Sequence, residues 1–295
     1  MLQLDVLHQF LQQNPSYFIA AVLVVSLMVG SFLNVVIYRL PLMMEQDFKH
    51  EYHDYFHPEQ QPLPRERFNL AVPNSRCPHC KHPLAIHDNI PLLSWALLKG
   101  HCRYCQAPIS VRYPAIEALT AVLSGVVAWY YGASSMGYLG VILTWVLVTL
   151  SFIDIDKMLL PDEITQPTLW GLLLAAVMGW TTITAEQAVI GAVAGYLSLW
   201  TVFWAYKLPT GKEGFGYGDF KLMAIFGALL GWQLLPQIIL LSSLVGAVIG
   251  GSVMLLNKSG RDTKIPFGPY IAAAGWIALV WGQDINQWYL RSIGL

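Results

Sequence analysis

The stretch Phe215-Gly-Tyr-Gly-Asp219-Phe220 places an aspartate directly after a glycine-rich turn and directly before a hydrophobic run. A second stretch, Ser151-Phe-Ile-Asp154-Ile-Asp156, places an aspartate directly after a hydrophobic run. A charged side chain within a membrane span costs about 2.5–3.5 kcal/mol on insertion scales, so such a residue is a functional candidate by default. The two stretches together predict that aspartates from different helices meet at one membrane face.

The composition indicates a membrane protein. Of the 295 residues, 55% are apolar and only 12% are charged, whereas a water-soluble domain carries about 25% charged residues. The apolar excess is therefore expected to face membrane lipid. The net charge is −1 and the charges are segregated along the chain, so the basic surface that binds nucleic acid is not expected.

Apolar runs long enough to cross a membrane recur along the chain. A crossing helix needs about 20 residues, so the shortest runs must include flanking residues. Residues 1–16 contain no Lys or Arg, so the first run is expected to be a retained helix and not a secretory signal. The sequence predicts an all-α polytopic membrane protein with about eight transmembrane helices, over residues 17–38, 114–132, 138–153, 164–182, 187–206, 220–235, 236–256 and 267–283.

The basic residues predict the orientation of these spans. If the N-terminus is outside, the inside segments are 39–113, 154–163, 207–219 and 257–266. Every Lys and Arg except Arg291 then falls on or beside an inside segment, including Lys258, Arg261 and Lys264 in the last one. Short cytoplasmic loops carry this excess of basic residues. Both termini are therefore expected outside, and both aspartate stretches are expected at the cytosolic face.

The four cysteines of the chain form two pairs, Cys77-Pro-His-Cys80 and Cys102-Arg-Tyr-Cys105, between the first and second apolar runs. Two such pairs at this separation are typical of a four-thiolate zinc site. Four thiolates leave no open position for water, so the predicted zinc is structural. A redox pair is the alternative, although it would need a helix N-terminus to lower the pKa of one thiol.

Other residues near the span ends leave alternatives open. Asn34, inside the first run, either packs helices together or lines a ligand pocket. Pro41 is expected to end this helix, and residues 42–68 then form a polar linker. Arg112 and Glu117 either pair at the membrane border or belong to a polar ligand site. Asp162, which follows Pro161, is expected mainly to cap the next helix.

Several of these motifs occur together in one family. The chain resembles the prepilin leader peptidases, the bifunctional type IV leader peptidase and N-methyltransferase family of bacterial inner membranes. The resemblance runs from Gly30-Ser-Phe-Leu-Asn34 through the cysteine pairs and Gly216-Tyr-Gly-Asp219 to Pro266-Phe-Gly-Pro269. In that family the Gly-x-Gly-Asp aspartate, here Asp219, works with an aspartate seven residues before the proline of a Leu-Pro-Asp element. This rule selects Asp154 and not Asp156.

The resemblance also implies what the chain acts on. It implies cleavage of the leaders of type IV prepilins and pseudopilins at the cytosolic face, with periplasmic termini. It further implies methylation of the new N-terminus with S-adenosylmethionine as the methyl donor. Residues 1–115 would then carry the first helix, the zinc module and the N-methyltransferase part. Residues 116–295 would form the peptidase core.

Two aspartates suit peptide-bond hydrolysis, because one ionised carboxylate takes a proton from water while a protonated one polarises the carbonyl. Two close carboxylates share a proton, since both cannot ionise cheaply. Two other functional classes compete. A transporter that relays protons or binds a cation would also use paired intramembrane carboxylates, but it leaves the cysteines unexplained. A zinc-dependent scaffold of the secretion machinery is the third possibility.

Overall fold

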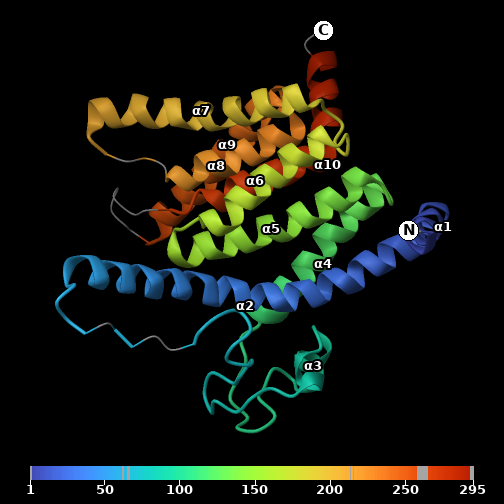
Figure 1. Cartoon of the computed structure of the whole chain (residues 1–295). Helices are drawn as coiled ribbons and strands as arrows, with labels where there is room; N and C mark the ends of the chain where they lie inside the picture. Colours follow the sequence, from blue (N-terminus) through green and yellow to red (C-terminus); the bar gives the residue numbers. More distant parts are fainter. Residues whose placement is uncertain are drawn as a thin grey trace. The chain divides into compact units, whose positions relative to one another are not determined.

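All eight predicted apolar runs form helices. The computed structural model describes residues 2–61, 63–64, 67–212, 214, 216–257 and 265–292, and these residues contain two isolated β-bridges and no β-strand. The described elements are α1 (Leu2–Gln13), α2 (Pro15–Phe56), η1 (Ile86–Asn89), α3 (Leu93–Leu97), α4 (Arg112–Tyr131), α5 (Ser135–Lys157), α6 (Asp162–Val177), α7 (Ala185–Thr210), α8 (Tyr217–Leu230), η2 (Trp232–Leu234), α9 (Leu235–Asn257) and α10 (Gly268–Ser292) (Figure 1).

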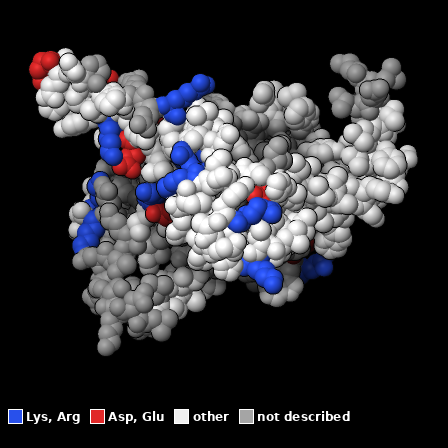
Figure 2. All heavy atoms as spheres, turned by 90° about the horizontal axis from the view of Figure 1, so that it is seen from below, with Lys and Arg blue, Asp and Glu red and all other residues white. Residues whose placement is uncertain are grey.

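Among the residues that the structure describes, four segments are long and apolar enough to cross a membrane: Pro15–Phe56, Ser135–Lys157, Ala185–Thr210 and Trp232–Ser252. Figure 2 shows one face of the molecule, on which Lys, Arg, Asp and Glu are scattered among wide areas without charged side chains. Both observations agree with a helical membrane protein. Membrane crossing by the other four predicted runs stays a prediction.

Helix α2 corrects one expectation. Pro41 does not end the first helix, because α2 continues without a break from Pro15 to Phe56 and contains Pro41 in its interior. An interior proline removes only one backbone hydrogen bond, and a helix that is otherwise well stabilised can contain one at some cost. Residues 42–56, expected to be a linker, are therefore helical. The basic residues Lys258, Arg261 and Lys264 lie outside the described residues.

The chain folds as two units. Unit 1 comprises residues 1–18 and 127–295, and unit 2 comprises residues 19–126. Helix α8 forms the core of unit 1, because the side chains of Phe220, Leu222, Met223, Ile225 and Phe226 are completely buried. A 14-residue helix that is apolar on nearly all sides belongs inside a bundle.

Helices α7 and α8 approach each other more closely than side chains would allow. A Cβ atom on Gly191 of α7 would lie 2.1 Å from the carbonyl oxygen of Gly227 on α8, and one on Gly195 would lie 2.5 Å from the carbonyl oxygen of Met223. Small residues at a helix crossing permit this backbone contact in membrane proteins. The contact fixes α8, and hence its N-terminal turn, against α7.

Unit 2 is built on a crossing of α2 and α4. A Cβ atom on Gly30 would lie 2.8 Å from the Cα atom of Glu117. The Asn34 amide donates hydrogen bonds to the carbonyl oxygens of Gly30 and Tyr113, both at 3.2 Å, so it links the two helices. The helix-packing alternative for Asn34 therefore has direct support.

Candidate active site and four-cysteine cluster

Asp154 lies in the last turn of α5, where its side chain is only 5% exposed. Helix α5 ends because Met158 takes a left-handed conformation, with φ of 51°, and its N–H donates to the Asp154 carbonyl at 2.8 Å. One carboxylate oxygen of Asp154 accepts a hydrogen bond from the Gly268 N–H at the start of α10, at 2.9 Å. The carboxylate is therefore held by the backbone of a segment more than a hundred residues away.

Gly268 permits this contact because it has no side chain. A Cβ atom at this position would lie 2.7 Å from the carboxylate oxygen that accepts the hydrogen bond. The sequence indicates that Pro266-Phe-Gly-Pro269 could frame the same cleft as the aspartates, but it does not predict the hydrogen bond from Gly268. The prolines on both sides of Phe267-Gly268 were the available signal for a shaped turn.

Asp219 lies in the first turn of α8 and is 6% exposed. Its carboxylate accepts a hydrogen bond from the Gly216 N–H at 3.0 Å, so it caps its own helix. A carboxylate in this position satisfies one of the backbone donors that every helix N-terminus leaves unpaired. Phe215, at the start of the quoted motif, lies outside the described residues.

The structure brings the two aspartates together within unit 1. The end of α5 and the starts of α6, α8 and α10 lie on the same side of this unit (Figure 1). Leu160 lies between Gly218 and Gly268, because Cβ atoms on these glycines would lie 2.6 Å and 3.2 Å from its side chain. Asp154 is close enough to Asp219 to interact with it electrostatically. Two buried carboxylates therefore meet at one end of the bundle.

The neighbouring acidic residues differ from this pair. Asp156, two residues after Asp154, is exposed. Asp162 lies in the first turn of α6, but it follows the N-cap residue Pro161, and both of its carboxylate oxygens accept hydrogen bonds from Lys221, at 2.5 and 2.8 Å, instead of capping the helix. Asp154 thus differs from Asp156 and Asp162 because it is buried and they are exposed.

The four cysteines form the second cluster, in unit 2. All four are free, and their sulfur atoms lie within 4.8 Å of one another. The Cys77 and Cys105 sulfur atoms are 3.8 Å apart, far beyond a disulfide bond of about 2.05 Å. Four sulfurs at Zn–S distances of 2.3 Å around a tetrahedral ion are separated by about 3.8 Å. The cluster has the chemistry and the spacing to hold a metal ion.

Each cysteine pair is built by the same turn. The Lys81 N–H donates to the Cys77 carbonyl and the Gln106 N–H donates to the Cys102 carbonyl, both at 3.0 Å. Lys81 and Gln106 both have positive φ, 59° and 57°. One antiparallel bridge closes each turn, between Arg76 and Pro83 and between His101 and Pro108. The sequence shows the two CxxC pairs, but it does not show that both pairs adopt the same backbone turn.

Side chains join the two cysteine turns. The rings of His82 and Tyr104 stack with centroids 3.6 Å apart. Arg103 forms an ion pair with Asp88 at 2.7 Å, and this guanidinium lowers the pKa of the Asp88 carboxyl. The segment between the cysteine pairs forms η1 and the five-residue helix α3.

Together these features define a helical membrane protein with two buried aspartates in one unit and a four-thiolate cluster in the other. A model of the bacterial peptidase A24 N-terminal domain matches residues 24–131, and a model of the type IV leader peptidase family matches residues 141–251. No solved structure matches the chain.

Several curated relatives match nearly the whole chain, and each is named a prepilin leader peptidase/N-methyltransferase. The relative from Aeromonas hydrophila is 55% identical over 94% of this chain and 96% of its own length. Those from Pseudomonas aeruginosa and Legionella pneumophila are 49% and 43% identical, over 97% and 90% of this chain and 98% and 92% of their own lengths. The chain therefore belongs to the type IV leader peptidase family. Neither the family models nor the relatives support the transporter alternative.

Replacing Gly268 by alanine tests the contact with Asp154. The added Cβ atom would displace either the carboxylate or the α10 backbone. We expect the kcat of leader cleavage to fall about 100-fold, because a shift of about 1 Å at a catalytic group costs that much. Gly171→Ala on α6 is the matched control, because a Cβ atom there meets nothing within 4 Å. A wild-type kcat for Gly268→Ala would show that the hydrogen bond does not position Asp154.

Proposed function

We propose that the chain cuts the leader peptide from type IV prepilins and pseudopilins, with Asp154 and Asp219 as the catalytic pair. The observation that carries this proposal is that two carboxylates, on α5 and α8, are both buried and lie near the same side chain, Leu160, at one end of unit 1. The family membership and the names of the relatives support the same activity.

The geometry suits an aspartic mechanism. One ionised carboxylate takes a proton from the attacking water, while the protonated partner donates a hydrogen bond to the scissile carbonyl. Two carboxylates that interact strongly hold one proton between them over a wide pH range. The N–H groups of Gly268 and Gly216 each occupy one carboxylate oxygen, so the free oxygens are the ones available to water and substrate.

Burial supports Asp154 over Asp156 as the partner of Asp219. An exposed carboxylate such as Asp156 is solvated by water and gains little from a second acid. A buried one is desolvated, and its ionisation depends on its neighbour. Asp156 is exposed beside the buried pair, so it is a candidate for attracting the basic leader by its charge.

We place the catalytic pair at the cytosolic face of the inner membrane, with both termini periplasmic. The distribution of Lys and Arg supports this orientation. The order of the helix ends agrees with both aspartates lying at one membrane face. The end of α5 and the starts of α6, α8 and α10 share one side of unit 1, as helices that cross alternately would have them. The prepilin's apolar segment would then remain in the lipid.

The second activity in the names of the relatives is N-methyl transfer, with S-adenosylmethionine as the proposed donor. We propose that unit 2 carries it and that a structural zinc ion on Cys77, Cys80, Cys102 and Cys105 holds this unit together. The four thiolates satisfy zinc fully and leave no position for a reactant. The zinc would therefore shape the unit and take no part in chemistry.

Mass spectrometry of a prepilin incubated with the purified full-length protein tests the proposal. Without S-adenosylmethionine, the prepilin should lose the mass of its leader. With it, the mature product should gain one methyl group at its N-terminus. An intact prepilin in both reactions would contradict the peptidase assignment, and a cleaved but never methylated product would contradict the second activity alone.

A further inference from the structure

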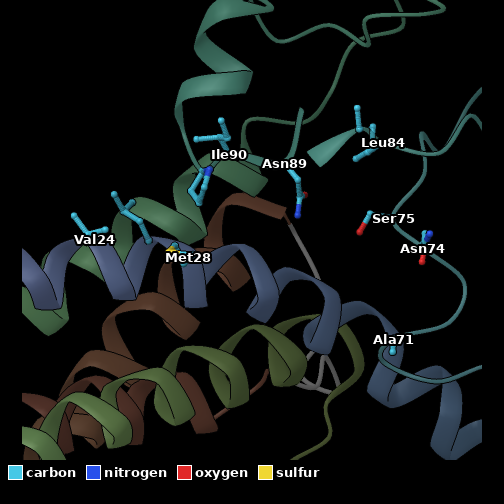
Figure 3. Close-up of a pocket in the computed structure, with 11 residues that line it drawn as sticks. Val24, Met28, Ala71, Asn74, Ser75, Leu84, Asn89 and Ile90 are labelled. Carbon is cyan, nitrogen blue, oxygen red and sulfur yellow. The ribbon is translucent and has the colours of Figure 1, made fainter. Parts of the chain in front are cut away.

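Unit 2 contains a cavity of about 700 Å³ that the aspartate chemistry does not use. One wall is helix α2, which contributes Val24, Leu27 and Met28 (Figure 3). The facing wall comes from the segment that leads into the first cysteine pair and from η1 and the residues after it. It is formed by Ala71, Asn74, Ser75, Leu84, Ala85, Asn89, Ile90 and Pro91.

The two walls differ in chemistry. The α2 wall is apolar and includes the thioether of Met28. The facing wall carries the side chains of Asn74, Ser75 and Asn89, for which the described residues provide no hydrogen-bond partner. Amide and hydroxyl groups both donate and accept hydrogen bonds. An apolar surface opposite a few uncharged polar groups is the usual lining of a small-molecule site, for which 700 Å³ is an ordinary size.

The lining selects a class of ligand. None of its residues is acidic or basic, so the lining offers no counter-charge to a phosphate group or to the charged methionine part of S-adenosylmethionine, and only an uncharged group suits it. A flat heteroaromatic ring fits the apolar wall, and its nitrogen edge and attached hydroxyls fit the amides and the serine. We propose that this cavity binds the adenosyl group of S-adenosylmethionine. The proposal rests on the proposed N-methyltransferase function and assigns its donor to unit 2.

Glu117 holds the facing wall in place. Its side chain is 8% exposed and accepts a hydrogen bond from the Leu92 N–H at 2.8 Å. Leu92 has a φ of 57°, so the chain turns sharply directly after Pro91, the last lining residue. Gly30 allows α4 to bring Glu117 this close to α2. Glu117 is therefore a positioning residue for the cavity.

Photolabelling of the wild-type protein tests the site without any variant. The full chain in detergent micelles is irradiated with 8-azido-S-adenosylmethionine, and the labelled peptides are mapped by mass spectrometry. Label within residues 24–28 or 71–91 that excess S-adenosylmethionine prevents is the expected result. Specific label confined to other residues, or none, would overturn the proposal. Methylation of a cleaved prepilin by the same preparation reports separately on the proposed N-methyltransferase function.

Variants test the same point by equilibrium dialysis with radiolabelled S-adenosylmethionine. Ala71→Phe and Ala85→Phe fill the cavity from two places, and each should weaken binding at least about tenfold, which is about 1.4 kcal/mol. Ala96→Phe adds the same bulk at an exposed position outside the cavity lining, so it should bind like the wild type. Wild-type affinity in both filled variants would contradict the assignment.

Donor binding by two Glu117 variants tests the positioning role of this residue. Glu117→Ala removes the acceptor for the Leu92 N–H, whereas Glu117→Gln keeps a carbonyl oxygen there. We expect Ala to weaken donor binding and Gln to restore most of it, with an unchanged zinc content in both. Equal binding by the wild type and Glu117→Ala would show that the wall does not depend on this hydrogen bond.

Discussion

Asn at position 154 or at position 219 should abolish leader cleavage. An amide can neither take a proton from water nor share one with the remaining carboxylate, so the pair loses its function when either member changes. We expect kcat to fall by about 10³-fold or more for Asp154→Asn and for Asp219→Asn. The double variant should be little worse, because residues that act as a unit show non-additive losses. Steady-state cleavage of a prepilin peptide in detergent measures all three.

Asp156→Asn is the matched control. It makes the same change on the same helix, two residues on, at an exposed position. It should keep kcat within a few-fold of the wild type and act, if at all, on KM for the basic leader. A large loss of kcat in Asp156→Asn, together with an active Asp154→Asn, would show that Asp156 and not Asp154 is the partner of Asp219.

Loss of one cysteine should disrupt unit 2. Cys77→Ser replaces a buried thiolate ligand with a poor one, and structural zinc contributes about 10–16 kcal/mol to folding in zinc-finger peptides. That is comparable with the total stability of a domain, about 5–15 kcal/mol. We expect the variant to lose its zinc and to become sensitive to protease between residues 57 and 110. Metal analysis by atomic absorption and limited proteolysis measure the two effects.

His79→Ala is the control for this variant. His79 lies between Cys77 and Cys80 in the sequence, but the cluster of possible ligands in the described residues comprises only the cysteines. It should therefore keep one zinc per chain and the wild-type proteolysis pattern. If Cys77→Ser also kept one zinc, the four-thiolate assignment would be wrong.

Sequence patterns predicted the features that depend on local rules. The helices over the apolar runs follow from hydrophobicity and length, and the cysteine cluster follows from spacing. Asp154 was preferred over Asp156 from a family rule, and the structure adds that only Asp154 is buried.

Long-range contacts could not be predicted in the same way. The hydrogen bond from Gly268 to Asp154 joins segments whose approach depends on how α5, α8 and α10 pack, and no local pattern encodes that packing. The cavity in unit 2 likewise forms between α2 and a loop that has no regular period. The prediction that Pro41 ends the first helix was wrong because helix propensity is a weak prior, and the surrounding residues outweigh it.

The uninterrupted helix α2 has a consequence for the segment that joins it to the cysteine turns. Its 42 residues extend about 63 Å, twice the thickness of the hydrocarbon core, so its polar second half must project into water. Arg39, near the middle, donates hydrogen bonds to the carbonyl oxygens of Asn69 and Leu70, at 3.0 and 3.4 Å. The backbone at Asn69 and Leu70 is therefore held beside Arg39, in the middle of α2. Because Arg39 holds Asn69 and Leu70 beside α2, we expect a change in the length of the polar half of this helix to leave the cysteine turns in place.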